Sequence, residues 1–235
     1  MIKTAVIIAG GEGIRFKPLS DNKPKAMIEV HGQPMLFWII QWLKSQSIKN
    51  LVLGVAYKKE RIYDYMAQNK NFGMNVQFSE HTLEGGTAQG FKLAISRFVR
   101  DEVYLAMNCD EITNLSIPLL YEAHKAQNAL ATLAVTPFHC RFSTVNLEKD
   151  GVISGFKYGH ILENVLVSIG IYIFNAKLVE YLPETGSIEN LVFSKLAQEK
   201  KLGSYRLAAH EEWISVNDPK NVHEVEENLH ILTRK

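Results

Sequence analysis

Cysteine is scarce in this sequence, and the little that is present forms no recognisable pattern. Cys109 and Cys140 are the only two cysteines, and they lie far apart along the chain. A structural zinc site needs four closely spaced Cys or His ligands, and a disulfide framework needs several cysteine pairs. We therefore expect two buried, reduced thiols rather than a metal centre or a disulfide scaffold.

A strong charge of one sign is also lacking. Lys and Arg number 26 and Asp and Glu number 25, which gives a formal net charge of +1 at pH 7. Surfaces that coat nucleic acid usually carry a clear basic excess. We therefore expect no nucleic-acid partner, although a local basic pocket for a small anion is compatible with this balance.

Long hydrophobic runs are absent as well. The longest apolar stretch, "PMLFWIIQWL", is broken by Gln41 and is much too short to cross a bilayer. The opening "MIKTAVIIAGG" carries a shorter apolar run than a secretory signal needs, and it ends in glycines. We expect a cytoplasmic protein without a membrane partner.

The first half of the chain alternates strand and helix patterns, with no Pro-, Gly- or Ser-rich linker between them. A length of 235 residues fits one large domain or two small ones, and the missing linker favours one. We expect strands at 4–9, 50–56, 75–79, 102–108 and 129–136, and helices at 34–46, 59–69, 87–98 and 119–127. This alternation predicts an α/β fold, a Rossmann-like three-layer domain with a mostly parallel mixed sheet and helices on both faces.

The second half is richer in strand patterns. Two strand runs flank "EKDG" within 143–157, which indicates a hairpin, and a further strand is expected at 165–175. A helix is expected at 187–200, short strands at 202–207 and 212–216, and a last helix at 220–232 after Asp218 and Pro219. We interpret this half as a small β-rich extension of the same sheet that lines the far side of a cleft.

A glycine-rich stretch, "AGGEGIRFKPLSDNKPKAM" at 9–27, follows the first expected strand. Glycines allow backbone N–H groups to approach a phosphate closely, and Arg15 and Lys25 add cationic donors. A dinucleotide fingerprint is excluded because Phe16 stands where its third glycine belongs, and the GxxxxGK[ST] pattern of a P-loop is absent. The stretch therefore indicates a phosphate site of a different kind.

These residues carry a family resemblance. "IIAGGEGIRFKPLSDNKPKAMIEVHGQPML" at 7–36 resembles the signature GGxGTRxxPxT…PKxxxxV…KPM of the sugar-1-phosphate nucleotidyltransferases. The resemblance continues in "GGTAQGFKLAI" at 85–95, in "LAMNCDEI" at 105–112 and in "EWISVNDPKNVHEVEE" at 212–227. It spans nearly the whole chain and implies the short, single-domain form of the family, with a nucleotide-binding half over about 1–110 and a sugar-phosphate half over about 111–235.

The resemblance implies a reaction in which a nucleoside triphosphate (NTP) and a sugar 1-phosphate give an NDP-sugar and pyrophosphate. Arg15, Lys25 and Asp110 would be catalytic, with Arg15 at the β- and γ-phosphates and Lys25 at the α-phosphate. Asp110 and Asn217 would hold the cofactor Mg²⁺. The implied nucleotide-binding residues are Ala9, Gly10, Gly11, Gly13, Arg15, Lys25, Glu80, Gly86 and Thr87, and the implied sugar-phosphate-binding residues are Asn108, Lys157, Ser168 and Gly170.

This sequence departs from the family pattern mainly on the sugar side. Ile14 replaces the usual Thr of GxGTR, and Cys109 replaces the usual Gly before the metal-binding Asp. Many members carry a Glu-Lys-Pro stretch after a Phe, whereas "GFKYGH" places Lys157 two positions early and without the Glu. Either the acceptor is unusual or catalysis is weakened.

Several functions therefore stay open. The donor would be GTP for a mannose- or heptose-like phosphate, or dTTP or UTP for a glucose-like one. A cytidylyltransferase that acts on another small, non-sugar phosphate is an alternative. A regulatory subunit that senses a nucleotide or NDP-sugar is another. Homo-oligomerisation is left open.

Overall fold

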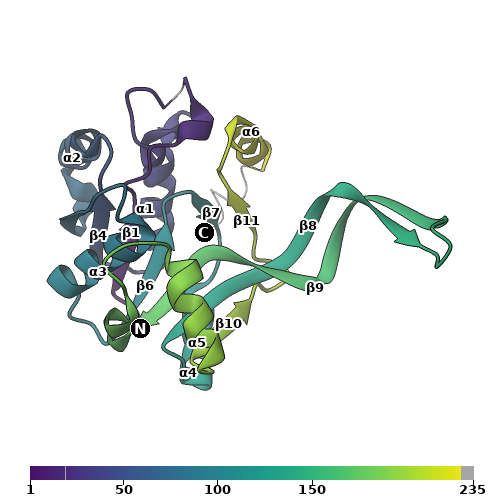
Figure 1. Cartoon of the computed structure of the whole chain (residues 1–235). Helices are drawn as coiled ribbons and strands as arrows, with labels where there is room; N and C mark the ends of the chain where they lie inside the picture. The colour runs from purple at the N-terminus through teal and green to yellow at the C-terminus, as the bar shows by residue number, and fades with distance from the viewer. Residues whose placement is uncertain (19, 229–235) are drawn as a thin grey trace.

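The computed structural model describes residues 1–18 and 20–228. Its main feature is a seven-stranded sheet in the order β10-β8-β9-β6-β1-β4-β5. The strands of the first half are β1 (Thr4–Ile8), β4 (Asn50–Val55), β5 (Asn75–Glu80) and β6 (Val103–Asn108). The helices between them are α1 (Met35–Ser45), α2 (Lys59–Gln68) and α3 (Gly86–Phe98). Figure 1 shows the helices packed around this sheet and a long hairpin that leaves it on one side.

The four strands of the first half of the chain are parallel to their neighbours among these strands. β1 pairs in parallel with both β4 and β6, and β4 pairs in parallel with β5. β9 (Ile153–Asn175) is antiparallel to β6 and to β8 (Ala131–Leu147), whereas β10 (Leu202–Arg206) runs parallel to β8. The predicted mostly parallel mixed sheet is confirmed, because helical crossovers return each strand of the first half to the same direction.

Apolar side chains cover both faces of the sheet. Along β1, Ala5 and Ile7 belong to one hydrophobic cluster, and Val6 and Ile8 belong to the other. The first cluster includes residues of α1, α2 and α4 (Ile117–Gln127), and the second includes residues of α3 and α5 (Ser194–Gln198). Two buried faces explain why these strands are continuous apolar runs rather than alternating ones.

The second half departs from the expected layout in two ways. The separate strand runs predicted from the sequence merge into two long strands, β8 and β9, whose outer halves extend well beyond the sheet (Figure 1). In addition, β11 (Trp213–Ser215) does not extend the main sheet, because it pairs with β7 (Glu111–Thr113) in a separate two-stranded sheet. Alternation predicts a strand, but it does not say which neighbour the strand pairs with.

The shorter elements complete the path of the chain. Their bounds are η1 (Ile14–Phe16), η2 (Lys25–Met27), β2 (Glu29–Val30), β3 (Gln33–Pro34), η3 (Lys70–Gly73), η4 (Ala176–Tyr181), η5 (Glu189–Phe193) and α6 (Pro219–Glu227).

The helix start expected at Asp218 and Pro219 is confirmed, and α4 begins with a similar cap. Ser116 caps α4, and Asp218 caps α6 by accepting hydrogen bonds from the backbone N–H groups of Lys220 and Asn221. The part of the predicted last helix beyond 228 lies outside the described residues. Both cysteines are buried and free, as expected. In the described part of the chain, no helix is long and apolar enough to cross a membrane.

The buried His124 of α4 gives a testable pH dependence. Its Nδ1 lies 2.9 Å from the Thr132 hydroxyl, and burial lowers the pKa of the imidazole. The folded protein therefore favours the neutral ring, whereas the unfolded chain takes up a proton as the pH falls below about 6.5. The stability contributed by the neutral ring is complete above that pH and is lost as the pH falls through it.

We expect His124→Gln to reduce the loss of unfolding free energy between about pH 7.5 and about pH 5.5. The measurement is urea unfolding of both proteins at several pH values. Identical pH slopes in the two proteins would show that His124 is not linked to folding.

Candidate active site

Two neighbouring parallel strands, β1 and β6, end at the edge of the sheet where the site lies. Ile8, the last residue of β1, is in register with Asn108, the last residue of β6. The chain leaves β1 towards β4 on one side and later returns to β6 on the other, so strand order reverses between them. In open α/β sheets, ligands bind in the crevice at the carboxyl ends of strands at such a point.

Three backbone hydrogen bonds to other segments fix the glycine loop after β1. The N–H of Ala9 donates to the carbonyl of Gly54 at 2.7 Å, and the N–H of Tyr57 donates to the carbonyl of Gly10 at 3.2 Å. The N–H of Lys25 donates to the carbonyl of Gly11 at 2.9 Å. Gly13 has a φ of 69°, in the left-handed region that favours glycine. The loop therefore has a fixed course that brings it against the Lys25 segment.

The Lys25 side chain contacts both residues predicted to bind metal, the acidic Asp110 and the amide Asn217. Its Nζ lies 2.5 Å from Asp110 Oδ2 and 2.8 Å from Asn217 Oδ1. The Lys25 and Asp110 side chains are only 14% and 15% exposed, so water screens this ion pair weakly. Both oxygens converge on one cationic nitrogen, which means that they share a position suited to a cation.

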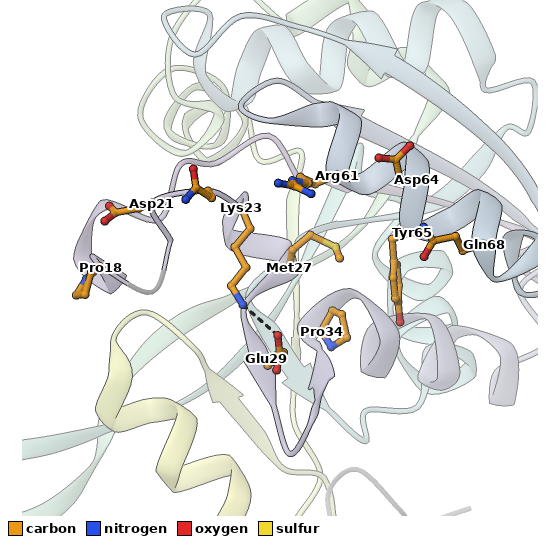
Figure 2. A pocket seen from close by; sticks show the side chains of 11 residues that line it. Pro18, Asp21, Lys23, Met27, Glu29, Pro34, Arg61, Asp64, Tyr65 and Gln68 are labelled. Atoms are coloured by element: carbon orange, nitrogen blue, oxygen red, sulfur yellow. Dashed lines mark hydrogen bonds and ion pairs between the residues drawn. The ribbon is translucent and has the colours of Figure 1, made fainter.

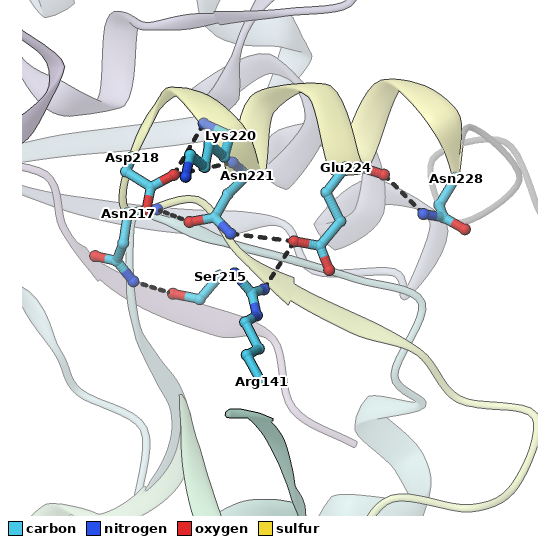
Figure 3. A network of polar contacts seen from close by, with 8 residues as sticks. All are labelled: Arg141, Ser215, Asn217, Asp218, Lys220, Asn221, Glu224 and Asn228. Carbon is cyan, nitrogen blue, oxygen red and sulfur yellow. Dashed lines mark hydrogen bonds and ion pairs between the residues drawn. The ribbon is translucent and has the colours of Figure 1, made fainter. Parts of the chain in front are cut away.

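The amide of Asn217 has a defined orientation (Figure 3). Its Nδ2 donates to the Ser215 hydroxyl at 2.5 Å, which leaves Oδ1 to face Lys25. Its backbone N–H donates to Asn221 Oδ1 at 3.2 Å, and Asn221 in turn donates to Glu224 at 3.1 Å. The start of α6 therefore presents the amide oxygen of Asn217, and not its nitrogen, to the site.

Glu111 is a site residue that the sequence analysis missed. It is 5% exposed, and its carboxyl group accepts hydrogen bonds from Trp213 Nε1 at 2.6 Å and from the Ser215 hydroxyl at 3.4 Å. Burial, and then the adjacent Asp110 carboxylate, raise the pKa of Glu111 well above its usual value. Glu111 thereby joins β7 to β11 directly behind Asp110 and Asn217. The sequence signal that could have identified Glu111 is its position in an acidic pair, Asp110-Glu111, directly after a strand.

A cleft of about 420 Å³ opens beside the glycine loop. Arg15, Lys25 and Asn217 line it together with Gly13, and Leu83 of the segment before α3 forms part of its wall. Arg15 is exposed, and Ile14 beside it is 66% exposed. The structure thus brings the two predicted phosphate-binding cations to one cleft, with Asp110 held against Lys25.

The other predicted nucleotide-binding residues are engaged in contacts within the protein. Glu80, at the end of β5, forms an ion pair with Lys59, and its other oxygen accepts a hydrogen bond from Tyr63 at 2.9 Å. The ion pair lowers the pKa of Glu80. Thr87 Oγ1 accepts from the N–H of Ile188 at 3.0 Å. Their assignment to a bound nucleotide stays a prediction.

Gly86 needs to be glycine for a structural reason. Its φ is 65°, and a Cβ atom there would lie 2.5 Å from the carbonyl oxygen of Gly186. The N–H of Ala88 donates to the same carbonyl at 2.9 Å. The start of α3 is therefore packed directly against the backbone of the segment before η5.

Of the predicted sugar-phosphate residues, Lys157 lies apart from the other three. Asn108 lies at the end of β6, and Gly170 packs against Glu111, since a Cβ there would lie 2.6 Å from Glu111 Oε1. Ser168 pairs with Val135 where β8 and β9 still belong to the sheet. Lys157 lies far along the hairpin, exposed and opposite Thr144, and the structure does not bring it to the glycine loop. A role for Lys157 stays a prediction that this placement does not support.

A second cleft, of about 470 Å³, lies between the 18–29 segment and α2 (Figure 2). Arg61, Asp64 and Tyr65 of α2 line one side, and Lys23 forms an ion pair with Glu29 at 3.1 Å on the other. None of the predicted site residues lines this cleft. The larger hollow is therefore separate from the glycine-loop site.

Comparison with known proteins places the chain among proteins of one family. A family model described as nucleotidyl transferase matches residues 4–230. Mannose-1-phosphate guanyltransferase from Yarrowia lipolytica is 29% identical over 227 residues, which cover 92% of this chain and 61% of that protein. The chain thus spans less than two thirds of the length of the curated relatives it matches.

Solved structures share the fold. HddC from Yersinia pseudotuberculosis superposes with a TM-score of 0.77 at 21% identity, over 97% of this chain and 100% of that chain. The structure of HddC complexed with GMP-PN gives a TM-score of 0.75 at 20% identity, with the same coverage. These likenesses confirm the Rossmann-like α/β fold expected from the sequence.

The packing beneath the glycine loop gives a matched pair of variants. A Cβ on Gly10 would lie 2.7 Å from the ring of the half-buried His81 and 2.9 Å from the Ala56 Cβ, whereas one on Gly11 would lie 3.9 Å from the Lys25 Cβ. We expect Gly10→Ala to lower the unfolding free energy by about 1–3 kcal/mol, the usual cost of overpacking. Gly11→Ala should change it by less than about 0.5 kcal/mol.

Urea unfolding monitored by circular dichroism measures both changes. An equal loss in the two variants, or no loss in either, would contradict the close packing of Gly10 on His81.

Proposed function

The chain belongs to the nucleotidyl transferase family, and we propose that it transfers a nucleotidyl group from a nucleoside triphosphate to a sugar 1-phosphate. The products would be an NDP-sugar and pyrophosphate. One observation carries the proposal: Arg15, Lys25 and Asn217 line a single cleft beside the glycine loop, with Asp110 bound to Lys25. A cleft with backbone N–H groups, two cations and two cation-binding oxygens matches the charges of a triphosphate and its metal.

The proposed step is an in-line displacement at the α-phosphorus. A phosphate oxygen of the sugar 1-phosphate forms a bond to that phosphorus, and the bond to the oxygen bridging to the β-phosphorus breaks, with the electron pair leaving on pyrophosphate. Such transfers depend on positioning and on neutralising charge more than on covalent chemistry by the protein. Lys25 would stabilise the charge on the reacting α-phosphoryl group, and Arg15 would bind the leaving pyrophosphate.

Asp110 and Asn217 would each supply one oxygen ligand of the kind that Mg²⁺ binds. Their oxygens already share one cationic neighbour, the Lys25 ammonium group. Among the described residues, no cluster of three or more His, Cys, Asp or Glu could hold a metal, so phosphates and water would supply the remaining ligands. Bound there, Mg²⁺ would neutralise phosphate charge and orient the two substrates.

We propose GTP and mannose 1-phosphate as the first substrates to test. The support comes from relatives named mannose-1-phosphate guanyltransferase, at 28–29% identity, and from a structural neighbour complexed with GMP-PN. Because the sequence departs from the family pattern in its sugar-phosphate half, other acceptors should be tested beside mannose 1-phosphate.

The decisive assay measures pyrophosphate release for each of GTP, dTTP, UTP and CTP, combined with mannose 1-phosphate, glucose 1-phosphate and non-sugar phosphates. Turnover with a sugar 1-phosphate is expected. Turnover only with CTP and a non-sugar phosphate would instead favour the cytidylyltransferase alternative. No turnover, together with thermal stabilisation by an NDP-sugar, would favour the sensor.

Two nearby lysines provide a controlled test of the site. We expect Lys25→Met to lower kcat/KM at least ~100-fold, because one well-placed electrostatic contact can supply that much transition-state stabilisation. Lys23→Met is the control: Lys23 pairs with Glu29 in the other cleft and should leave the rate near wild type. Steady-state pyrophosphate release gives both values, and a Lys25→Met enzyme with an ordinary rate would refute the assigned role.

The Lys25 contacts also predict how magnesium binds. Because the ammonium group holds the oxygens of Asp110 and Asn217, the free protein should bind Mg²⁺ weakly, and the nucleotide should strengthen binding by drawing Lys25 to its phosphates. Titration calorimetry with and without a non-hydrolysable nucleotide measures the difference. Tight Mg²⁺ binding to the nucleotide-free protein would contradict this exchange.

A further inference from the structure

The outer part of the β8–β9 hairpin, residues 137–166, is a two-stranded ribbon that we call the arm. β10 pairs with β8 only as far as Val135, which accepts the last bond from the N–H of Leu207, and β6 pairs with β9 only over 171–175. Beyond these positions β8 and β9 pair with each other, and Figure 1 shows the arm projecting away from the sheet. An isolated two-stranded ribbon is marginally stable in water and exposes two open edges.

The outer half of the arm has two chemically different faces. Val145 is opposite Phe156, and Leu147 is opposite Ile153. Directly opposite residues share a face, and so do alternate residues of one strand. Tyr158, two residues from Phe156, therefore joins them in one apolar face.

The other face of the same ribbon is polar. It carries Thr144 opposite Lys157 and Asn146 opposite Gly155. A register shift between Asn146 and Leu147 leaves Ser154 without a partner and keeps Ile153 on the apolar face. Alternation of this kind is typical of a sheet with one buried and one solvated face. The sequence of the arm is therefore patterned for burial on one side only.

The apolar face is nevertheless open to solvent within the chain. The exposed fractions are 44% for Val145, 66% for Leu147, 56% for Ile153, 70% for Phe156 and 74% for Tyr158. Side chains of these sizes and exposures present on the order of 600 Å² of apolar surface, the upper end of what a monomeric protein exposes in one patch. With a polar rim, this approaches the ~800 Å² that each partner buries in a standard protein–protein interface.

We propose that the apolar face of the arm binds the same face of a second copy of this chain, forming a two-fold symmetric dimer. A two-fold axis needs a self-complementary patch, and an apolar ribbon face can meet its own copy because it holds no charge that must find an opposite. The net charge of +1 gives two copies little long-range repulsion. Face-to-face packing of two ribbons reproduces the sandwich in which such alternating strands are buried.

Adjacent residues of β8 provide a matched test. Val145 lies on the apolar face and Asn146 on the polar face, and both are exposed, so a glutamate at either position leaves the fold of one chain intact. The full-length protein is expected to have twice the 26.6 kDa mass of one chain in light scattering. Val145→Glu should weaken the dimer at least ~100-fold, because it would place a charge in an apolar interface. Asn146→Glu should remain dimeric.

Three results would overturn the proposal. The first is a wild-type protein with the mass of one chain at every concentration, which would assign the face to another occupant. The second is a Val145→Glu protein that stays dimeric, and the third is equal dissociation of the two variants. Circular dichroism of each variant checks its folding.

Hydrogen exchange of the unmodified protein is an independent measurement. Amides of 153–161 should exchange more slowly at concentrations where the dimer forms than after dilution to the monomer. Concentration-independent exchange of this segment, in a protein whose mass still doubles, would place the dimer contact elsewhere and contradict the proposal.

Discussion

The ion pair of Lys25 with Asp110 holds the site together. It joins residues 85 positions apart, and the bond from the same ammonium group to Asn217 spans 192 positions. This nitrogen brings together side chains from the segments that follow the glycine loop, the end of β6 and β11, and backbone hydrogen bonds from Lys25 to Gly11 and from Val216 to Asp110 support the same arrangement. Because the pair is largely shielded from water, losing one partner would leave a poorly solvated charge, which costs far more than a surface ion pair. The arrangement of the three segments therefore depends on keeping all of these groups.

The position of that contact follows from the topology of the sheet. Helical crossovers make β1 and β6 parallel neighbours, so their carboxyl ends lie side by side. Each end then delivers a different chemical group: backbone N–H groups from the glycine loop, and a carboxylate from Asp110. The small sheet of β7 and β11 adds the third group, since buried Glu111 links Trp213 and Ser215 beside Asn217. The scaffold is general, and the specific chemistry is carried by a few loop residues.

The features of the fold and site that depend on short stretches of sequence could be predicted from the sequence. The strand–helix alternation that predicted the fold lies within short stretches, and so do the glycine loop, the spacing of Arg15 and Lys25 and the strand before Asp110. The phosphate-binding role of these residues stays a prediction. Contacts between residues far apart in the chain could not be predicted from the sequence. Glu111 finds Trp213 across 102 positions, and no local pattern announces that contact. The position of Lys157 far along the hairpin was also not predictable, because alternation gives the direction of a side chain but not how far a strand extends from its sheet.

The arm has a consequence for the hydrodynamics of the molecule. A strand advances about 3.3 Å per residue, so the part of β8 from 137 to 147 extends roughly 35 Å. A compact protein of this length has a radius of gyration of only about 18 Å. The chain therefore experiences more friction than a sphere of equal mass and will elute early from a size-exclusion column. Its shape alone makes a single copy resemble a larger particle.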